Sequence, residues 1–269
     1  MNELFNIKDK VVVITGSTGI LAGELARYLA KEGAKIVFMG RSQAKLNSVM
    51  KDVANYDCMG CIADVLDRLA LEKARSDVLQ KYGKIAALIN GAGGNMPGAT
   101  ISPEKTFFDL DISQWAEVLK LNLQGTLLPT MVFGEVFKEQ KYGCVVNFSS
   151  MTAESAVTRV LGYSNAKASV NNLTKWLAVE FAQKFGEGIR VNAIAPGFFI
   201  SEQNRALLTN PDGSFTQRGQ TVINKTPFKR FGKADEICGA AHYLISDASK
   251  FVTGTIMSID GGFSCFSGV

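Results

Sequence analysis

The sequence predicts an α/β fold, a three-layer doubly wound sheet of parallel strands with helices on both faces. Short β-rich runs alternate with helical patterns along the chain, which is typical of strand–helix–strand units. Each strand-like run is apolar nearly throughout rather than alternating, as expected for strands that helices cover on both sides. The length of 269 residues fits one domain spanning residues 1–269.

The order of the elements follows from the same patterns. We expect seven strands, at 11–15, 35–39, 58–62, 85–90, 144–148, 190–194 and 255–259. We expect helices at 20–32, 42–54, 66–82, 111–140, 161–186 and 234–246. Segment 197–230 has no clear period, and a stretch of this kind in a compact domain is usually a lid or a binding loop. We therefore predict a substrate lid at 197–230.

Composition excludes several classes of function. Apolar residues make up 46% of the chain, charged residues 20%, and the net charge of +4 is spread along it, so we expect no nucleic-acid surface. No apolar stretch reaches membrane-spanning length, and the first residues are too polar for a signal peptide. The five cysteines and the single His242 predict reduced thiols in a cytoplasmic protein, with no metal site and no Ser/His/Asp triad.

The first strand-to-helix turn carries a nucleotide signal. Thr15-Gly16-Ser17-Thr18-Gly19 follows an apolar strand and opens a helix. Glycines there let the backbone turn sharply and approach a pyrophosphate, which the helix N-terminus then stabilises. The end of the second strand reads Gly40-Arg41-Ser42, without an acidic residue for ribose hydroxyls. Because Arg41 suits a 2′-phosphate, and Ser42 can donate to that phosphate while it caps the next helix, we expect NADP(H) to be favoured, with NAD(H) as the alternative.

Tyr163 and Lys167 form the clearest chemical pair. They lie four residues apart in a helical segment, so their side chains share one face. A neighbouring ammonium and a positive nicotinamide lower the phenol pKa from about 10, so that Tyr163 can exchange a proton with an alcohol or carbonyl oxygen. Ser149 and Ser150 end the fifth strand, where a hydroxyl can bond the same oxygen.

Over essentially its full length, the chain resembles the short-chain dehydrogenase/reductases, which have a Rossmann fold. The matching elements, in chain order, are Thr15-Gly16, Asp64-Val65, Asn90-Gly-Ala-Gly93, Asn122, Ser150, Tyr163, Lys167, Pro196-Gly197 and Asp260-Gly-Gly262. The resemblance implies that Ser150 polarises the substrate oxygen, and that Tyr163 transfers the proton. It implies that Lys167 holds the nicotinamide ribose and lowers the Tyr163 pKa, and that Asn122 supports a water in a proton relay.

The resemblance also implies a set of cofactor contacts. They are Gly16, Ser17, Thr18, Gly19, Ile20, Leu21, Arg41, Ser42, Asp64, Val65, Asn90, Gly91, Ala92, Gly93, Tyr163, Lys167, Pro196, Gly197 and Phe199. The glycine turn departs from the family pattern, because Ile20 and Ala22 occupy its second and third glycine positions. Alanine still permits close helix–strand packing, and we expect Gly19 to supply the unusual backbone conformation.

Several stretches are similar to a narrower group, the D-mannonate oxidoreductases (fructuronate reductases). They are 89–95, 107–111, 125–130, 192–199, 202–205, and the tail from 260 to 269. This similarity implies a sugar-acid substrate. Arg205 or Arg159 would hold its carboxylate, with hydroxyl contacts from Asn95, Thr152, Gln203 and Asn204 beside Ser150 and Tyr163. Gly40-Arg41 departs from the acidic residue expected in NAD-using mannonate enzymes.

Other interpretations stay open on sequence alone. One is a gluconate 5-dehydrogenase-like or other polyol or carbonyl reductase, and another is a nucleotide-binding regulator without turnover. The family resemblance also implies a homotetramer or homodimer, in which the helices at 111–140 and 161–186 form one interface and the final strand region a second. The apolar residues that would serve the first interface are Leu119, Leu123, Leu127, Leu173, Trp176, Leu177 and Phe181.

Overall fold

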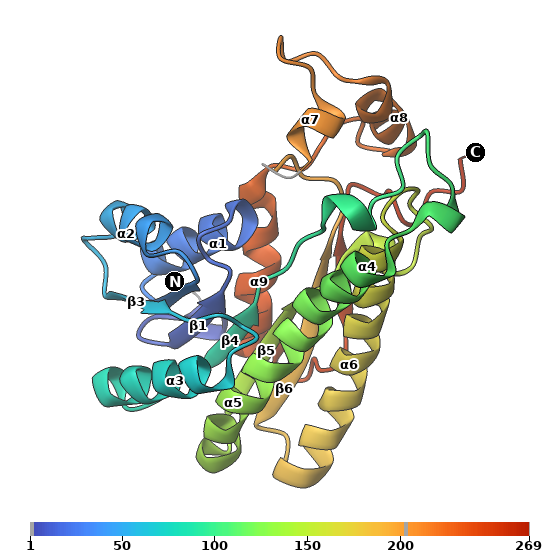
Figure 1. Ribbon diagram of the computed structural model, residues 1–269. Helices are drawn as coiled ribbons and strands as arrows, with labels where there is room; N and C mark the ends of the chain where they lie inside the picture. The colour runs from blue at the N-terminus through green and yellow to red at the C-terminus, as the bar shows by residue number, and fades with distance from the viewer. Residues whose placement is uncertain (1–2, 202–203, 269) are drawn as a thin grey trace.

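A seven-stranded parallel sheet with helices on both faces forms the centre of the molecule (Figure 1). The computed structural model describes residues 3–201 and 204–268. The strand order is β3-β2-β1-β4-β5-β6-β7, so the chain reverses direction across the sheet between β1 and β4. This order and the two helical layers confirm the predicted doubly wound Rossmann fold.

The strands and helices lie close to their predicted positions. The strands are β1 (Val11–Thr15), β2 (Lys35–Gly40), β3 (Cys58–Ile62), β4 (Ala87–Asn90), β5 (Gly143–Phe148), β6 (Ile189–Pro196) and β7 (Ile256–Ile259). The helices are α1 (Ile20–Lys31), α2 (Gln43–Asp52), α3 (Arg68–Tyr82), α4 (Ile112–Leu119), α5 (Gly125–Gln140), α6 (Leu161–Phe185), α7 (Arg205–Leu208), α8 (Gln217–Lys225) and α9 (Cys238–Ile245). Short 3-10 turns lie at Glu3–Phe5, Pro97–Ala99, Phe107–Asp109, Met151–Ala153, Ala234–Ile237 and Asp247–Ser249.

The apolar strands fill two separate cores. Val12 and Ile14 of β1 pack with α1, α2 and α9 on one face of the sheet. Val11 and Val13 of the same strand pack with α3, α5 and α6 on the other face. Successive side chains of a strand point to opposite faces. A strand buried on both sides is therefore apolar at nearly every position, as the sequence pattern indicated.

The two edge strands depart from that pattern. Ile62 of β3 is 45% exposed, and Met257 and Ile259 of β7 are only half-buried. An edge strand has one neighbour and incomplete helical cover. The expectation that every strand would be covered on both faces is therefore wrong for β3 and β7.

The predicted helix at 111–140 contains a wider turn. α4 and α5 are joined by a π-helical turn, Lys120–Gln124. Within it, Asn122 Nδ2 donates to the Val118 carbonyl over 2.8 Å, and this side chain competes with the backbone N–H that an α-helix would use there. Extra residues of this kind inside helices are frequent at functional sites, and this one places Asn122 beside the cavity described below.

Segment 197–230 is more regular than its sequence indicated. It contains α7 and α8, which stand above the carboxyl edge of the sheet (Figure 1). A small separate core of Leu208, Val222, Ile223 and Phe231 holds these helices together. None of the helices in the described part of the chain has the length and apolar character needed to cross a membrane.

Candidate active site

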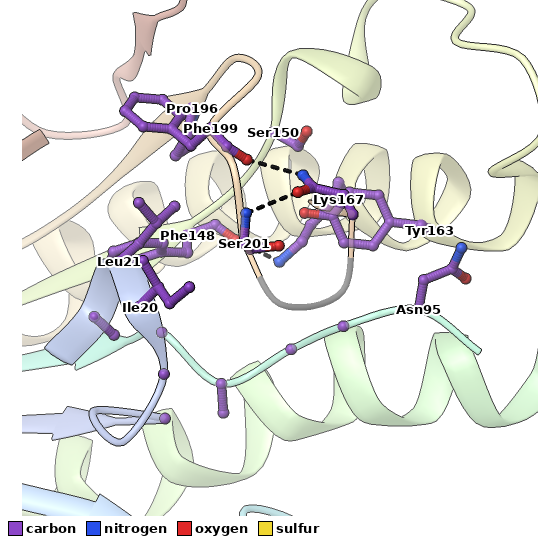
Figure 2. A pocket seen from close by; sticks show the side chains of 18 of the residues that line it. Ile20, Leu21, Asn95, Phe148, Ser150, Tyr163, Lys167, Pro196, Phe199 and Ser201 are labelled. Carbon is purple, nitrogen blue, oxygen red and sulfur yellow. Dashed lines mark hydrogen bonds between the residues drawn. The ribbon is translucent and has the colours of Figure 1, made fainter. Parts of the chain in front are cut away.

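A cavity of about 670 Å³ opens at the carboxyl ends of the parallel strands (Figure 2). Its walls come from the turn between β1 and α1, the segments after β4, β5 and β6, the first turns of α6, and the segment holding α7 and α8. It lies where the strand order reverses, which is the usual ligand site of a doubly wound sheet.

Most of the residues assigned to cofactor contacts line this cavity. They are Gly16, Thr18, Gly19, Ile20, Leu21, Arg41, Val65, Gly91, Ala92, Gly93, Tyr163, Lys167, Pro196, Gly197 and Phe199. The structure therefore brings the glycine turn and the Tyr163–Lys167 pair, which are far apart in sequence, to opposite ends of one space.

Gly16 allows two loops to meet at the cavity. Its φ is +67°, a conformation that favours glycine. A Cβ on Gly16 would lie 2.7 Å from Ala92 Cα, so a side chain does not fit there. Thr15 Oγ1 accepts hydrogen bonds of 3.2 Å from the N–H groups of Gly91 and Ala92. The turn after β1 and the segment after β4 are thus held against each other.

Helix α1 begins at Ile20 with its first N–H groups directed to the cavity end of the helix. Gly19 is the N-cap, and no side chain there bonds the first turn, so its orphan donors are available to an anion. Gly19 has φ −88°, so the prediction that it supplies the unusual conformation is wrong, and Gly16 supplies it. Gly23 of α1 lies against the turn that precedes the helix, where a Cβ would lie 2.9 Å from Ser17 O.

Four of the predicted cofactor residues are absent from the cavity lining among the described residues. The Ser17 hydroxyl accepts from Met39 N at 2.9 Å and is fully buried. Ser42 caps α2, as expected, by accepting from Lys45 N. Asp64 accepts from Leu66 N at 2.9 Å. Asn90 donates to Thr130 and Asn147 inside the protein. Their side chains have backbone or core partners instead.

The end of β2 is cationic. Arg41 lines the cavity with a side chain that is 68% exposed, and its Nη1 lies 3.6 Å from Asp64 Oδ2. Lys45, one turn into α2, lines the same end of the cavity and was not among the expected cofactor contacts. Arg41 and Lys45 therefore make this end of the cavity cationic.

Ser150, Tyr163 and Lys167 gather at the other end (Figure 2). Lys167 Nζ lies 5.4 Å from the centre of the Tyr163 ring, which confirms that both side chains share one face of α6. Nζ also donates to Phe148 O over 2.7 Å, so the end of β5 fixes its position. The neighbouring Ser149 donates to Asn171 Oδ1, which leaves Ser150 as the serine whose hydroxyl accepts from Thr152 N and can donate into the cavity.

Burial controls the titration of the pair. It raises the pKa of the Tyr163 phenol above its ordinary value, and the nearby Ser150 hydroxyl opposes this rise. Burial lowers the pKa of Lys167 to about 8. In the chain by itself, desolvation of the phenolate outweighs the favourable hydrogen bond from Ser150. The lowering of the Tyr163 pKa beside a positive nicotinamide stays a prediction.

Asn122 connects the π-helical turn to the segment after β4. Its Nδ2 donates to Gly94 O over 2.7 Å, and its Oδ1 accepts from Gly94 N over 3.1 Å. A Cβ on Gly93 would lie 2.6 Å from Asn122 Oδ1. The side chain of Asn122 is therefore committed to shaping the loop that lines the cavity, and its carbonyl accepts from Thr126 Oγ1.

Two buried polar atoms of the described residues that line the cavity lack partners. Asn95 Oδ1 and Thr152 Oγ1 are buried without a hydrogen bond among the described residues, and both residues line the cavity. Figure 2 shows Asn95 on the segment opposite Tyr163. Buried polar atoms are normally satisfied, so these two atoms are available to a polar ligand, and their contact with substrate hydroxyls stays a prediction.

The predicted carboxylate-binding arginines are placed differently. Arg205 is exposed at the start of α7, and neither Arg205 nor Arg159 is among the described residues that line the cavity. Asn204 lines it, but its amide bonds Ser201 N and Phe199 O within the same segment. Gln203 lies outside the described residues. Arg218 of α8 does line the cavity, in addition to Lys167.

Arg218 left a faint signal in the sequence. Gly219, Val222 and Ile223 are the buried residues of α8, and Arg218 lies four residues before Val222, on the inward face of the helix. A charged residue on the apolar face of a short helix indicates a functional role. This signal was missed because segment 197–230 was expected to contain no helix.

No three His, Cys, Asp or Glu side chains gather as a metal site in the described ranges. The single His242 is buried on α9, where Nδ1 is 3.0 Å from Tyr28 Oη and Nε2 is 2.7 Å from Phe5 O. These contacts tie the N-terminal segment to α9, so packing accounts for this residue.

Comparison with known proteins places the chain among oxidoreductases. A family profile described as enoyl-(acyl carrier protein) reductase matches residues 17–264. The chain is 43% identical over 275 residues to "Uncharacterized oxidoreductase UxuB" of Bacillus subtilis, covering 98% of each protein.

Two crystal structures are similar over their length. One, from Haemophilus influenza, has the proposed activity of a D-mannonate oxidoreductase and holds NAD; it is 38% identical, with a TM-score of 0.91 and 98% of both chains covered. A gluconate 5-dehydrogenase from Burkholderia cenocepacia, in complex with NADP and tartrate, is 28% identical, with a TM-score of 0.87 and 98% of both chains covered.

Proposed function

This chain belongs to the short-chain dehydrogenase/reductase family of NAD(P)-dependent oxidoreductases, and we propose that it interconverts the keto group of D-fructuronate and the secondary alcohol of D-mannonate. One observation carries the proposal: Ser150, Tyr163 and Lys167 line the same cavity as two unpartnered polar atoms. These atoms are Asn95 Oδ1 and Thr152 Oγ1. The similarity to the Haemophilus protein supports the same substrate pair.

The cavity fits a dinucleotide. The glycine turn excludes side chains where Gly16 meets Ala92, and the uncapped N-terminus of α1 offers N–H donors to a pyrophosphate. Arg41 and Lys45 would hold the adenosine end, and Tyr163 and Lys167 the nicotinamide ribose. When bound, the nicotinamide supplies a hydride to the carbonyl carbon or accepts one from the alcohol carbon.

Tyr163 is the proton donor for reduction in this proposal. Its raised pKa keeps the phenol protonated at neutral pH, which is the form that gives a proton to the carbonyl oxygen. Ser150 donates a hydrogen bond to the same oxygen and stabilises the charge that develops there. In the oxidation direction, Tyr163 must first lose its proton, and the ammonium of Lys167 favours that phenolate.

We propose that NADP(H) is the preferred cofactor and that NAD(H) is also accepted. Arg41 lies where a 2′-phosphate would be recognised, although its contact with Asp64 neutralises part of its charge. Arg41→Ala should raise the KM for NADPH roughly 10-fold or more, the effect of losing a charge-assisted hydrogen bond, and leave the KM for NADH nearly unchanged. Equal effects on the two cofactors would refute the preference.

The substrate proposal is tested by absorbance at the reduced-nicotinamide band. Wild-type protein with NADPH or NADH should lose absorbance when D-fructuronate is added, and Tyr163→Phe should lose nearly all of this activity while it still binds cofactor. Retained turnover in Tyr163→Phe would overturn the role of the phenol. Absence of turnover by wild type would overturn the D-fructuronate assignment.

A gluconate 5-dehydrogenase activity is the second candidate, and the similarity to the Burkholderia enzyme favours it. 5-Keto-D-gluconate and a neutral ketose in the same assay distinguish the three substrate classes. A nucleotide-binding regulator without turnover is disfavoured because Ser150, Tyr163 and Lys167 are all present in one cavity.

We also propose a homo-oligomer, a dimer or a tetramer, and a lid function for segment 197–230. Trp176 and Val179 of α6 are 60% and 57% exposed, and Met131 of α5 is 49% exposed. Exposed apolar side chains that are close together commonly mark a contact with another chain. Leu177, which the sequence analysis assigned to this interface, is buried within the core of the protein instead.

A further inference from the structure

Arg218 is fixed at the Tyr163 end of the cavity. Its Nη1 donates to Thr158 Oγ1 and its Nη2 to Thr158 O, each over 3.1 Å. These bonds join α8 to the loop that precedes α6. They use only part of the donor fork of a guanidinium, so the remaining N–H groups can bind a ligand in the cavity that Arg218 lines.

Among the described residues, no acidic side chain offsets the charge of Arg218. No carboxylate lies within salt-bridge distance of it in residues 3–201 and 204–268. Burial lowers the pKa of Arg218, and the nearby charge of Arg159 lowers it further. Arg218 also lies in the first turn of α8, where the helix dipole disfavours a cation. An anion bound here would relieve all three of these unfavourable contributions.

Other polar groups that line the same cavity suit an anion that also carries hydroxyls. Thr152 is 7% exposed, and its Oγ1 is unpartnered. The Asn95 amide donates to Thr100 Oγ1 over 3.0 Å, whereas its Oδ1 is left without a donor. Hydroxyl groups can donate to Asn95 Oδ1 and can both donate to and accept from Thr152. A guanidinium can bind the carboxylate of a sugar acid, and the two unpartnered oxygen atoms can bind its hydroxyl groups.

We infer that Arg218 binds the carboxylate of the substrate and selects sugar acids over neutral sugars. This inference rests on the proposed function and specifies the group that recognises the acid. Arg205, the residue that the sequence favoured, is exposed and outside the described cavity lining. Arg159 contributes through its nearby charge, and Thr158 positions the guanidinium.

The test compares two arginine variants of the same segment, Arg218→Gln and Arg205→Gln. Calorimetric titration with D-mannonate is done with NADPH present, so that the alcohol is not oxidised, and neutral D-mannitol is titrated in parallel. Arg218→Gln should weaken D-mannonate binding roughly 10- to 100-fold, as expected when a charge-assisted hydrogen bond is lost. D-Mannitol binding should not change, and Arg205→Gln should match wild type with both ligands.

Several outcomes would overturn the inference. Equal weakening of D-mannonate and D-mannitol by Arg218→Gln would show that Arg218 only tethers α8 to the loop at Thr158. Unchanged D-mannonate binding in that variant, or failure of the wild type to bind either D-mannonate or D-gluconate, would also refute it. Arg218-dependent binding of D-mannonate without turnover of D-fructuronate would refute the proposed substrate pair and leave the carboxylate site supported.

Discussion

At the scale of single residues, burial acts in opposite directions on the two members of the reactive pair. It raises the pKa of Tyr163 and lowers that of Lys167 to about 8, because the charged form of each is disfavoured in a dry site. The two shifts separate the pKa values of Tyr163 and Lys167, which are similar for the exposed side chains. The phenol of Tyr163 therefore stays protonated. Burying the ammonium of Lys167 lowers the stability of the folded chain.

We predict that Lys167 lowers stability at neutral pH. Its pKa in the folded chain, about 8, lies below the value of about 10.4 for an exposed lysine. The unfolded chain therefore binds more protons between these values, and stability rises with pH across that window. The free energy of unfolding of wild type, measured relative to Lys167→Met, should rise by about 2.5 kcal/mol between pH 8 and pH 10.5.

Urea denaturation of both proteins at several pH values measures this difference. Lys167→Met is expected to be more stable than wild type at pH 7 and to have almost no activity. The difference between the two proteins should shrink as the pH approaches 10.5. A difference that does not change with pH would contradict the burial effect.

The residue types of the reactive trio were predictable because their chemistry depends on spacing along one helix and at one strand end. The partners of Ser17, Asp64 and Asn90 were not predictable. Each of these polar side chains could meet either a ligand or the protein, and tertiary packing decides which: Ser17 bonds the backbone of Met39, a residue 22 positions away along the chain.

At the scale of elements, the β1–α1 turn combines two requirements on Gly16. One is its φ of +67°, and the other is the close approach of Ala92. Gly83 ends α3 with a similar φ of +72°, but nothing lies within 4 Å of a Cβ built there. The two glycines therefore differ in crowding and are alike in backbone conformation.

We predict that Gly16→Ala destabilises the protein more than Gly83→Ala. The left-handed conformation should cost roughly 1–2 kcal/mol at either position, and crowding at Gly16 should add about 1–3 kcal/mol. Denaturant unfolding measures both values, and cofactor binding should weaken only in Gly16→Ala. Equal losses in the two variants would mean that the contact between the two loops contributes nothing.

The boundaries of helices were predictable where a capping side chain determines them. They were missed where a side chain competes with a backbone N–H for a carbonyl. Ser42 begins α2 as a capping residue, which its type indicated. The π-helical turn at Lys120–Gln124 depends on the contact of Asn122 with Val118 and Gly94, and periodicity alone cannot separate it from a continuous helix. The short helices α7 and α8 bury too few apolar residues to produce a long periodic signal.

At the scale of the whole molecule, helices cover both faces of the sheet, and this covering produced the clearest sequence pattern, the apolar strands. Apolar residues at every strand position imply helices on both sides, and parallel strands then follow because the helices must serve as crossovers. The cavity is a consequence of the same topology, since the connections from β1 and β4 diverge there. Contacts with further chains leave a weaker pattern, because an exposed apolar residue does not identify what covers it.

Trp176 offers a direct test of the proposed oligomer. Its side chain is 60% exposed on α6, and in an isologous interface one substitution alters both halves of the contact. Trp176→Arg should therefore shift the sedimentation coefficient toward that of a smaller species. Leu69→Arg is the matched control, because Leu69 is 77% exposed on α3, a helix outside the proposed interface, and it should leave the assembly unchanged. Wild-type protein that sediments as a monomer at micromolar concentration would refute the proposal, and an equal response of both variants would remove α6 from the interface.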